Sequence, residues 1–309
     1  MVESRRILVT GGSGFLGRHT VLPLLRRNAD VIVTGRRQCS GGLGENIRFL
    51  ELDLLRCADI DRPIQSAAAD TLIHLAWETR HGYFWQAPEN LDWIAASLRV
   101  VKAFAAAGGR RVVCAGTCVE YRAPPTGPCI PGITPIAPLQ LYGVAKDAFH
   151  RALAAYASTC GMTYAWGRVF FLTGPGEAPA RLVPSAIRTL AAGEPFASGS
   201  GDRVRDFMDV RDCGAAFAAL ALGDVEGAVN ISSGRPTTIE ELLRMVAGIM
   251  GRQDLVAFGK LPDRTDEPAN LWGDTNTLHR VVGFAPSFSL RDSLKAAVAC
   301  WEQAQPAHY

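Results

Sequence analysis

The feature that most constrains the fold is a regular alternation, in the first half of the chain, of short β-branched runs with longer amphipathic stretches. The runs are Ile7–Thr10, Val31–Thr34, Ile47–Leu50, Thr71–Ala76 and Arg111–Ala115. This alternation is typical of a parallel sheet covered by helices on both faces, because parallel strands need long crossover connections. Such crossovers are right-handed, and the ligand crevice lies at the carboxyl ends of the strands. We therefore expect an α/β fold with a Rossmann-type, doubly wound parallel sheet.

The second half of the chain is expected to complete this sheet and to add a smaller lobe. A helix over Gln140–Thr159 and a strand over Tyr164–Phe171 follow the alternating region. Beyond residue 173, glycine and proline separate shorter elements, which are expected as helices near 182–192, 215–222, 239–250 and 290–303 and a strand near 205–208. No clean linker separates the halves. We therefore expect a Rossmann domain over residues 1–173 and a small α/β carboxyl-terminal lobe over residues 174–309 that interleaves with it, with the substrate cleft between them.

Composition and charge exclude several classes of protein. A chain of 309 residues can bury a sizeable core. With 32 basic and 30 acidic residues, its net charge of +2 gives no reason to expect binding to nucleic acid or to a membrane surface. The first residues run straight into a strand-like segment, and no apolar run approaches about 18 residues, so we expect a soluble, cytoplasmic protein without a signal peptide. The eight cysteines form no C-x-x-C pair, so neither a metal site nor a disulfide framework is expected.

A glycine-rich turn, Thr10-Gly11-Gly12-Ser13-Gly14-Phe15-Leu16-Gly17, joins the first expected strand to an apolar helix. Glycine at such a turn removes the Cβ atoms that would keep a pyrophosphate from the amino terminus of the helix. A tight turn without any ligand would have the same spacing, but the strand-turn-helix setting favours dinucleotide binding. We expect the residues that contact NAD or NADP here to be Gly11, Gly14, Phe15, Leu16 and Gly17.

Residues after the second and third strands bear on which dinucleotide binds. Arg36 and Arg37 follow the second strand, where an NAD-selective site usually has an acid that holds the ribose hydroxyls. Guanidinium groups suit a ribose phosphate, so these arginines, with Arg18 just past the last glycine, favour NADP over NAD. The alternative is that they are exposed loop charges. Asp53, which ends the third strand and precedes Leu54, is expected to accept a hydrogen bond from the adenine amino group.

A second motif, Tyr142-Gly143-Val144-Ala145-Lys146, lies on the expected long helix. Residues four apart share one helix face, so the side chains of Tyr142 and Lys146 are neighbours. A nearby ammonium favours phenolate and lowers the pKa of the tyrosine, which can then exchange a proton with a substrate hydroxyl. Thr117, at the end of the run Val112–Thr117, can orient the substrate oxygen in the same crevice. The alternative is an exposed tyrosine and a solvated lysine; the catalytic candidates are Thr117, Tyr142 and Lys146.

Together these motifs resemble the extended short-chain dehydrogenase/reductase family, within its group of nucleotide-sugar epimerases, dehydratases and reductases. The likeness covers almost the whole chain. Its further motifs are His74-Leu75-Ala76, Arg168 through Gly174-Pro175-Gly176, Arg205 through Asp212, and Arg264 through Pro268.

The resemblance implies roles for several residues. The cofactor would also be contacted by Leu75, Ala76 and Lys146. The carboxyl-terminal lobe would bind a nucleoside diphosphate sugar, with Arg205 and Arg264 on the diphosphate and Arg181 at the nucleotide pocket, because paired guanidiniums can grip a diphosphate. A homodimer would form through the helices over residues 93–107 and 142–159.

Departures from the family pattern narrow the expected chemistry. In the sugar 4,6-dehydratases of this family an Asp and a Glu directly follow the catalytic Thr, whereas Cys118 and Val119 stand here and Glu120 is displaced by one. Phe171 stands where epimerases commonly have an Asn that contacts the sugar. We therefore expect an NADP(H)-dependent nucleotide-sugar 4-ketoreductase that also runs as a 4-dehydrogenase. The alternatives are a 4-epimerase with tightly bound NAD and a non-catalytic NADP-sensing protein.

An aromatic group follows the fourth strand and comprises Trp77, Tyr83, Phe84, Trp85 and Trp93. These side chains either stack on a sugar or nicotinamide ring or pack a helix onto the sheet. His74, on the strand itself, is expected to be structural.

Overall fold

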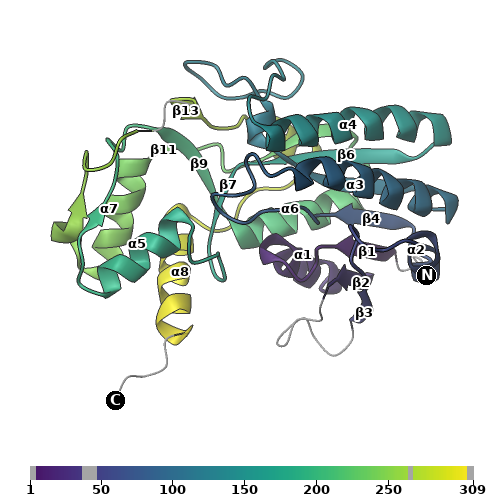
Figure 1. Ribbon diagram of the computed structural model, residues 1–309, viewed down its shortest axis with the longest axis horizontal. Coiled ribbons are helices and arrows are strands. Elements are labelled where there is room, and N and C mark those ends of the chain that lie inside the picture. Colours follow the sequence, from purple (N-terminus) through teal and green to yellow (C-terminus); the bar gives the residue numbers. More distant parts are fainter. Residues whose placement is uncertain (1–4, 37–46, 264–266, 305–309) are drawn as a thin grey trace.

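The larger part of the protein is a seven-stranded parallel sheet with helices on both faces (Figure 1). The computed structural model describes residues 5–36, 47–263 and 267–304. The strand order is β10-β6-β5-β4-β1-β2-β3, made of β1 (Arg6–Thr10), β2 (Asp30–Gly35), β3 (Arg48–Glu51), β4 (Thr71–His74), β5 (Arg111–Thr117), β6 (Thr163–Val169) and β10 (Gly227–Ile231). The expected Rossmann-type fold is confirmed.

Two layers of helices bury this sheet. Helices α1 (Phe15–Leu25) and α6 (Val210–Leu222) cover one face, and α2 (Asp61–Ala67), α3 (Glu89–Ala106) and α4 (Leu141–Cys160) cover the other. All residues of β4 are buried, as expected for a central strand with both faces covered.

The sheet reverses its winding between β1 and β4. The chain moves from β1 to β2 and β3 on one side, and from β4 to β5 and β6 on the other. Ligands of doubly wound sheets bind at the carboxyl ends of the strands beside such a switch point. Gly11, just after β1, has φ +69°, and a Cβ atom there would lie 2.8 Å from the backbone nitrogen of Ala76 after β4. Glycine is thus required where the two strand ends approach each other.

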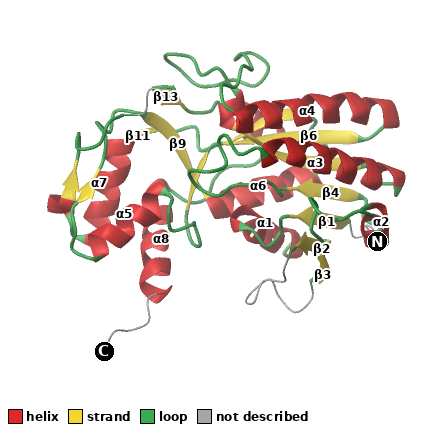
Figure 2. Ribbon diagram, viewed as in Figure 1, coloured by secondary structure: helices red, strands yellow, loops and turns green. Residues whose placement is uncertain are grey.

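The smaller part lies at the opposite side of the molecule in Figure 2. Its four-stranded sheet contains β7 (Phe171–Thr173), β9 (Val204–Asp209), β11 (Pro236–Thr238) and β13 (Asn270–Leu271), and a two-stranded sheet pairs β8 (Phe196–Ala197) with β12 (Val256–Ala257). Helices α5 (Leu182–Ala191), α7 (Ile239–Met250) and α8 (Leu290–Ala304) share a second hydrophobic core. Between these elements the chain returns to the larger part, since α6 and β10 both lie beyond residue 174.

Two elements differ from the sequence-based expectation. The strand expected over 164–171 is split at Phe170 into β6 and β7, and the Phe170 N–H bonds instead to the carbonyl of Ile231, 3.1 Å away. Helix α6 begins at Val210 rather than near residue 215, because the Asp209 carboxylate accepts the backbone N–H of Arg211 at 2.7 Å and caps the helix. The Arg205–Asp212 motif therefore contains both the end of β9 and the beginning of α6.

Candidate active site

The glycine turn leaves the amino terminus of α1 open to a ligand. A Cβ atom on Gly17 would lie 2.1 Å from the Gly11 carbonyl oxygen, so only glycine lets the helix pack this closely onto the turn. Gly14, the N-cap residue, is exposed, and no side chain in the described part of the chain caps the helix. The first backbone N–H groups, including those of Phe15 and Leu16, are therefore suited to an anionic group such as a pyrophosphate.

The structure describes four further residues expected at the cofactor: Arg18, Arg36, Asp53 and Leu54. Arg36 is exposed after β2, whereas Arg37 lies outside the described residues. Arg18 donates to the carbonyl of Gly14 at 3.3 Å and lies beside Gly176. Asp53 accepts the backbone N–H groups of Leu55 and Arg56 with one carboxylate oxygen, so it organises the turn in which Leu54 is buried.

The three residues predicted to catalyse are brought together by β5 and α4. Thr117 is the last residue of β5, and Tyr142 and Lys146 lie one turn apart at the start of α4. The Thr117 side chain makes a hydrogen bond with the Tyr142 phenol. The Lys146 Nζ lies 6.0 Å from the centroid of the Tyr142 ring. A substrate oxygen placed beside Thr117 would thus meet a proton donor and a nearby cation.

The Tyr142 ring is partly buried against two aromatic side chains. The ring meets Phe84 and Trp85 edge-on, with centroid separations of 4.8 and 6.0 Å, and its backbone N–H donates to the Trp85 carbonyl at 3.0 Å. Burial raises the pKa of Tyr142 above its usual value and the hydrogen bond with Thr117 opposes this effect, so the lowering expected from the Lys146 ammonium is not found. The phenol is therefore neutral at physiological pH and able to donate a proton.

Lys146 is also desolvated, and only 3% of its surface is exposed. Its Nζ donates to the Ala115 carbonyl at 2.9 Å and lies 3.8 Å from the centroid of the Trp77 ring. Burial lowers the pKa of Lys146 to about 7, while Cys114 and Glu120 have smaller, opposing effects. Near neutral pH the lysine can therefore carry or release its charge.

The arginines expected at the substrate have different surroundings. Arg205 is buried and donates to Glu267 at 2.9 Å and to the Pro268 carbonyl at 3.0 Å. Arg181 donates to the Thr79 carbonyl at 3.2 Å and lies 5.3 Å from the centroid of the Phe84 ring, beside the aromatic wall of Tyr142. Arg264 lies outside the described residues. Of the two arginines expected to grip the diphosphate, the structure therefore describes only Arg205.

Comparison with known proteins places the chain in a family. The model of the NAD dependent epimerase/dehydratase family matches residues 7–232, most of the chain. The chain belongs to this family. It is accordingly an enzyme of the NAD(P)-dependent oxidoreductase type, and the family resemblance inferred from the motifs is confirmed.

Relatives within the family extend over nearly the full length. A dTDP-6-deoxy-L-talose 4-dehydrogenase (NAD(+)) of Aggregatibacter actinomycetemcomitans is 24% identical over 86% of this chain and 98% of its own. A UDP-glucose 4-epimerase of Halalkalibacterium halodurans is 24% identical over 98% of this chain and 97% of its own. Among solved structures, MoeE5 in complex with UDP-glucuronic acid and NAD has a TM-score of 0.83 at 27% identity, covering 97% of this chain and 99% of that one.

The segment after Thr117 departs from the dehydratase pattern of the family. Residues Cys118–Glu120 form a short 3-10 helix, and Glu120 is fully buried beneath the sheet end. Its carboxylate accepts the Thr117 backbone N–H at 2.8 Å and pairs with Arg168 at 2.7 Å. A carboxylate held by these partners braces the end of the catalytic strand.

Sequence reasoning missed several contacts of this site. It placed Trp77 in an aromatic group but did not connect it to Lys146, and it did not identify Glu267 as the partner of Arg205. Trp77 and Trp93 stack on each other, with ring centroids 5.9 Å apart, so in part the group packs α3 onto the sheet. Residue types alone carry no signal for such pairs, since each joins segments far apart in the chain.

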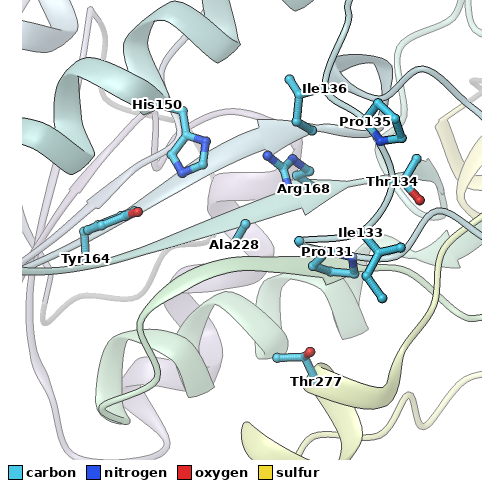
Figure 3. A pocket seen from close by; sticks show the side chains of 11 residues that line it. Pro131, Ile133, Thr134, Pro135, Ile136, His150, Tyr164, Arg168, Ala228 and Thr277 are labelled. Carbon is cyan, nitrogen blue, oxygen red and sulfur yellow. The ribbon is translucent and has the colours of Figure 1, made fainter.

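A separate cavity of about 650 Å³ lies at the β6–β10 edge of the sheet (Figure 3). It is lined by the loop 131–136, by His150 of α4, by Tyr164 and Arg168 of β6, by Ala228 of β10 and by Thr277. The Arg168 guanidinium is engaged by Glu120 and by the Tyr121 hydroxyl. This lining contains none of the cofactor, catalytic or substrate residues named above.

None of the helices in the described segments is both long enough and apolar enough to cross a bilayer.

Proposed function

We propose that the protein is an NADP(H)-dependent nucleotide-sugar 4-ketoreductase that also runs as a 4-dehydrogenase. The observation that carries this proposal is the neutral, partly buried phenol of Tyr142, hydrogen-bonded to Thr117 and one turn from Lys146. A neutral phenol is the form that donates a proton to a ketone during reduction. The 24% identical dTDP-6-deoxy-L-talose 4-dehydrogenase supports the same type of reaction.

Each catalytic side chain has a defined part in this reaction. Thr117 donates a hydrogen bond to the ketone oxygen and holds it beside Tyr142. The chemistry expected from bound NADPH is transfer of a hydride to the carbonyl carbon. Tyr142 donates its phenolic proton to the oxygen, which gives the alcohol, and the Lys146 ammonium stabilises the phenolate that forms. Lys146 would also hold the nicotinamide ribose, and the reverse sequence oxidises the alcohol.

The cofactor preference rests on the residues around the adenosine end. Arg36 is exposed directly after β2, where it can meet a ribose phosphate, and Arg18 lies at the start of α1. We propose NADP on this basis, together with cofactor contacts from Gly11, Gly14, Gly17, Leu75 and Ala76. NAD is the alternative, since NAD accompanies MoeE5 in its structure.

A 4-epimerase with tightly bound NAD is the second candidate, because several relatives are 4-epimerases. Phe171 argues against it. The Phe171 ring packs against Phe207, with centroids 5.8 Å apart, and lies 5.4 Å from the Arg205 guanidinium, so it offers no amide to a sugar hydroxyl. A non-catalytic NADP sensor is not favoured, because it would need no proton-transfer set.

The experiment that separates the two reactions uses desalted, purified protein. We expect cofactor-dependent consumption of NADPH with a 4-keto sugar linked to UDP, dTDP or GDP, and no NAD released on denaturation. Retained NAD, with interconversion of 4-epimers without added cofactor, would instead establish the epimerase. Oxidation supported by NAD but not by NADP would overturn the cofactor assignment.

We also propose a homodimer formed by the outer faces of α3 and α4, which lie side by side in Figure 1. These faces expose apolar side chains, led by Leu91 at 58% and Val144 at 45%. Alanines at 95, 148 and 155 are exposed on the same helices. Small and apolar residues allow close packing of four helices across a two-fold axis.

A further inference from the structure

The ammonium of Lys146 lies over an aromatic face. Its Nζ is 3.8 Å from the centroid of the Trp77 ring, well within the distance at which a cation is attracted by an indole. The ammonium also donates a hydrogen bond, at 2.9 Å, to the Ala115 carbonyl, which carries no charge. No ion pair joins Lys146 to a carboxylate within the described residues. The indole is thus the second group that stabilises this buried charge.

Trp77 is held so firmly that its ring position is fixed. Its indole N–H donates to the Asn90 Oδ1 at 2.8 Å, and Asn90 is itself anchored by hydrogen bonds to the carbonyls of Phe84 and Ala87. The ring stacks on Trp93 and on Phe149, with interplanar angles of 25° and 30°. Partners on α3 and α4 therefore set the plane that faces the lysine.

We propose that Trp77 is a positioning residue for Lys146, whose ring face holds the ammonium at the catalytic helix between the Ala115 carbonyl and the crevice. The inference rests on the proposed function only for the participation of Lys146 in turnover. A carboxylate in the place of the ring would bind the ammonium as an ion pair and draw it away from a cofactor ribose. An aromatic face stabilises the charge without accepting its protons in strong hydrogen bonds.

The other titratable groups around Lys146 do not replace this contact. Cys114 of β5 and Glu120 of the 3-10 helix favour its charged form, but Glu120 is already paired with Arg168. His74 of β4 is neutral, since burial lowers its pKa to about 3. Tyr142 of α4 is neutral as well. Removing the ring should therefore destabilise the ammonium and lower the pKa of Lys146.

The direct test observes Lys146 in protein without substrate. The chain has four lysines, Lys102, Lys146, Lys260 and Lys295, so ¹³C-labelled lysine gives few signals, and loss of one in Lys146→Arg assigns it. We expect Trp77→Leu to lower the pKa of Lys146 by about half to one and a half pH units. Trp77→Phe, which keeps an aromatic face, should shift it less. Trp93→Leu is the matched control, because Trp93 stacks on Trp77, whereas the Lys146 ammonium lies over the Trp77 ring.

A kinetic arm connects this titration to turnover. The alkaline limb of the pH profile of kcat should move to lower pH in Trp77→Leu by the same shift, with KM for the nucleotide sugar within about twofold. An unchanged Lys146 titration in folded Trp77→Leu, or an equal shift in Trp93→Leu, would overturn the inference. A shifted titration in a protein that reduces no nucleotide sugar would support the positioning role and count against the proposed function alone.

Discussion

At the scale of the residue, the site is defined by how water is excluded from its titratable side chains. Phe84 and Trp85 shield the phenol of Tyr142, and Trp77 covers the ammonium of Lys146. Burial moves the pKa values of these two groups in opposite directions, upward for the phenol and downward for the ammonium. Both shifts disfavour the charged forms, so the resting site holds a neutral acid beside a lysine that titrates near neutrality.

Replacing Tyr142 by Phe removes the proton donor and leaves the ring in its aromatic wall. Because general acid catalysis contributes about 10²- to 10⁴-fold, turnover should fall by that factor, while the dissociation constant of NADPH changes less than about twofold. Steady-state kinetics and a fluorescence titration of the cofactor measure the two quantities. Tyr156→Phe, on the same helix, is the control and should keep full activity. Full activity in Tyr142→Phe would remove the tyrosine from the mechanism.

His74 provides a second prediction, about stability. Its Nδ1 lies 2.7 Å from the Thr10 hydroxyl and its Nε2 lies 2.9 Å from the Ser97 hydroxyl, and burial lowers its pKa from 6.5 to about 3. Between these two values the unfolded chain binds more protons than the folded protein. Burial of His74 therefore lowers the free energy of unfolding by about 1.4 kcal/mol for each pH unit below the pKa of the histidine in the unfolded chain.

Urea unfolding between about pH 5 and 7 tests the contribution of His74. The loss of unfolding free energy with falling pH should be shallower in His74→Gln than in the parent protein, by up to about 1.4 kcal/mol per pH unit. His279→Gln is the control, because His279 is an exposed histidine on the short helix Thr277–Val281. Equal slopes for the parent and His74→Gln would show that His74 accepts a proton in the folded state.

At the scale of the element, long periodic segments were predictable and short ones were not. The helix expected over 239–250 is found as α7, whose Thr238 and Glu241 form a capping box. Strands β8, β12 and β13 span two residues each, too few to produce a periodic signal. Pairing partners define such strands, and sequence alone does not identify these partners.

The same contrast holds within the candidate site. The glycine turn and the Tyr142–Lys146 pair are local motifs, and local backbone geometry brings their residues together. Contacts between distant segments, such as Arg205 with Glu267, depend on tertiary packing that places β9 beside the segment leading to β13. The residue types were visible in the sequence, but their pairing was not.

At the scale of the whole molecule, the interleaved path of the chain joins the two parts. Helix α6 begins directly after β9 of the smaller sheet, yet it packs on α1 beneath the larger one. The packed helices α1 and α6 thereby connect the glycine turn at the start of α1 with Arg205, the expected substrate residue on β9. Assembly into a homodimer through the outer faces of α3 and α4 would leave this crevice accessible, because the crevice lies at the carboxyl ends of the strands and those faces point away from the sheet.

The proposed dimer gives the last prediction. Val144→Glu and Leu91→Glu each place a charge in the expected four-helix interface, where its burial without a partner is unfavourable. Each should raise the dissociation constant of the dimer by at least about tenfold, as light scattering over a dilution series would measure. The control is Leu22→Glu, since Leu22 is 40% exposed on α1 at the opposite sheet face. A parent protein that is monomeric throughout the series, or a Leu22→Glu variant that dissociates equally, would rule out α3 and α4 as the interface.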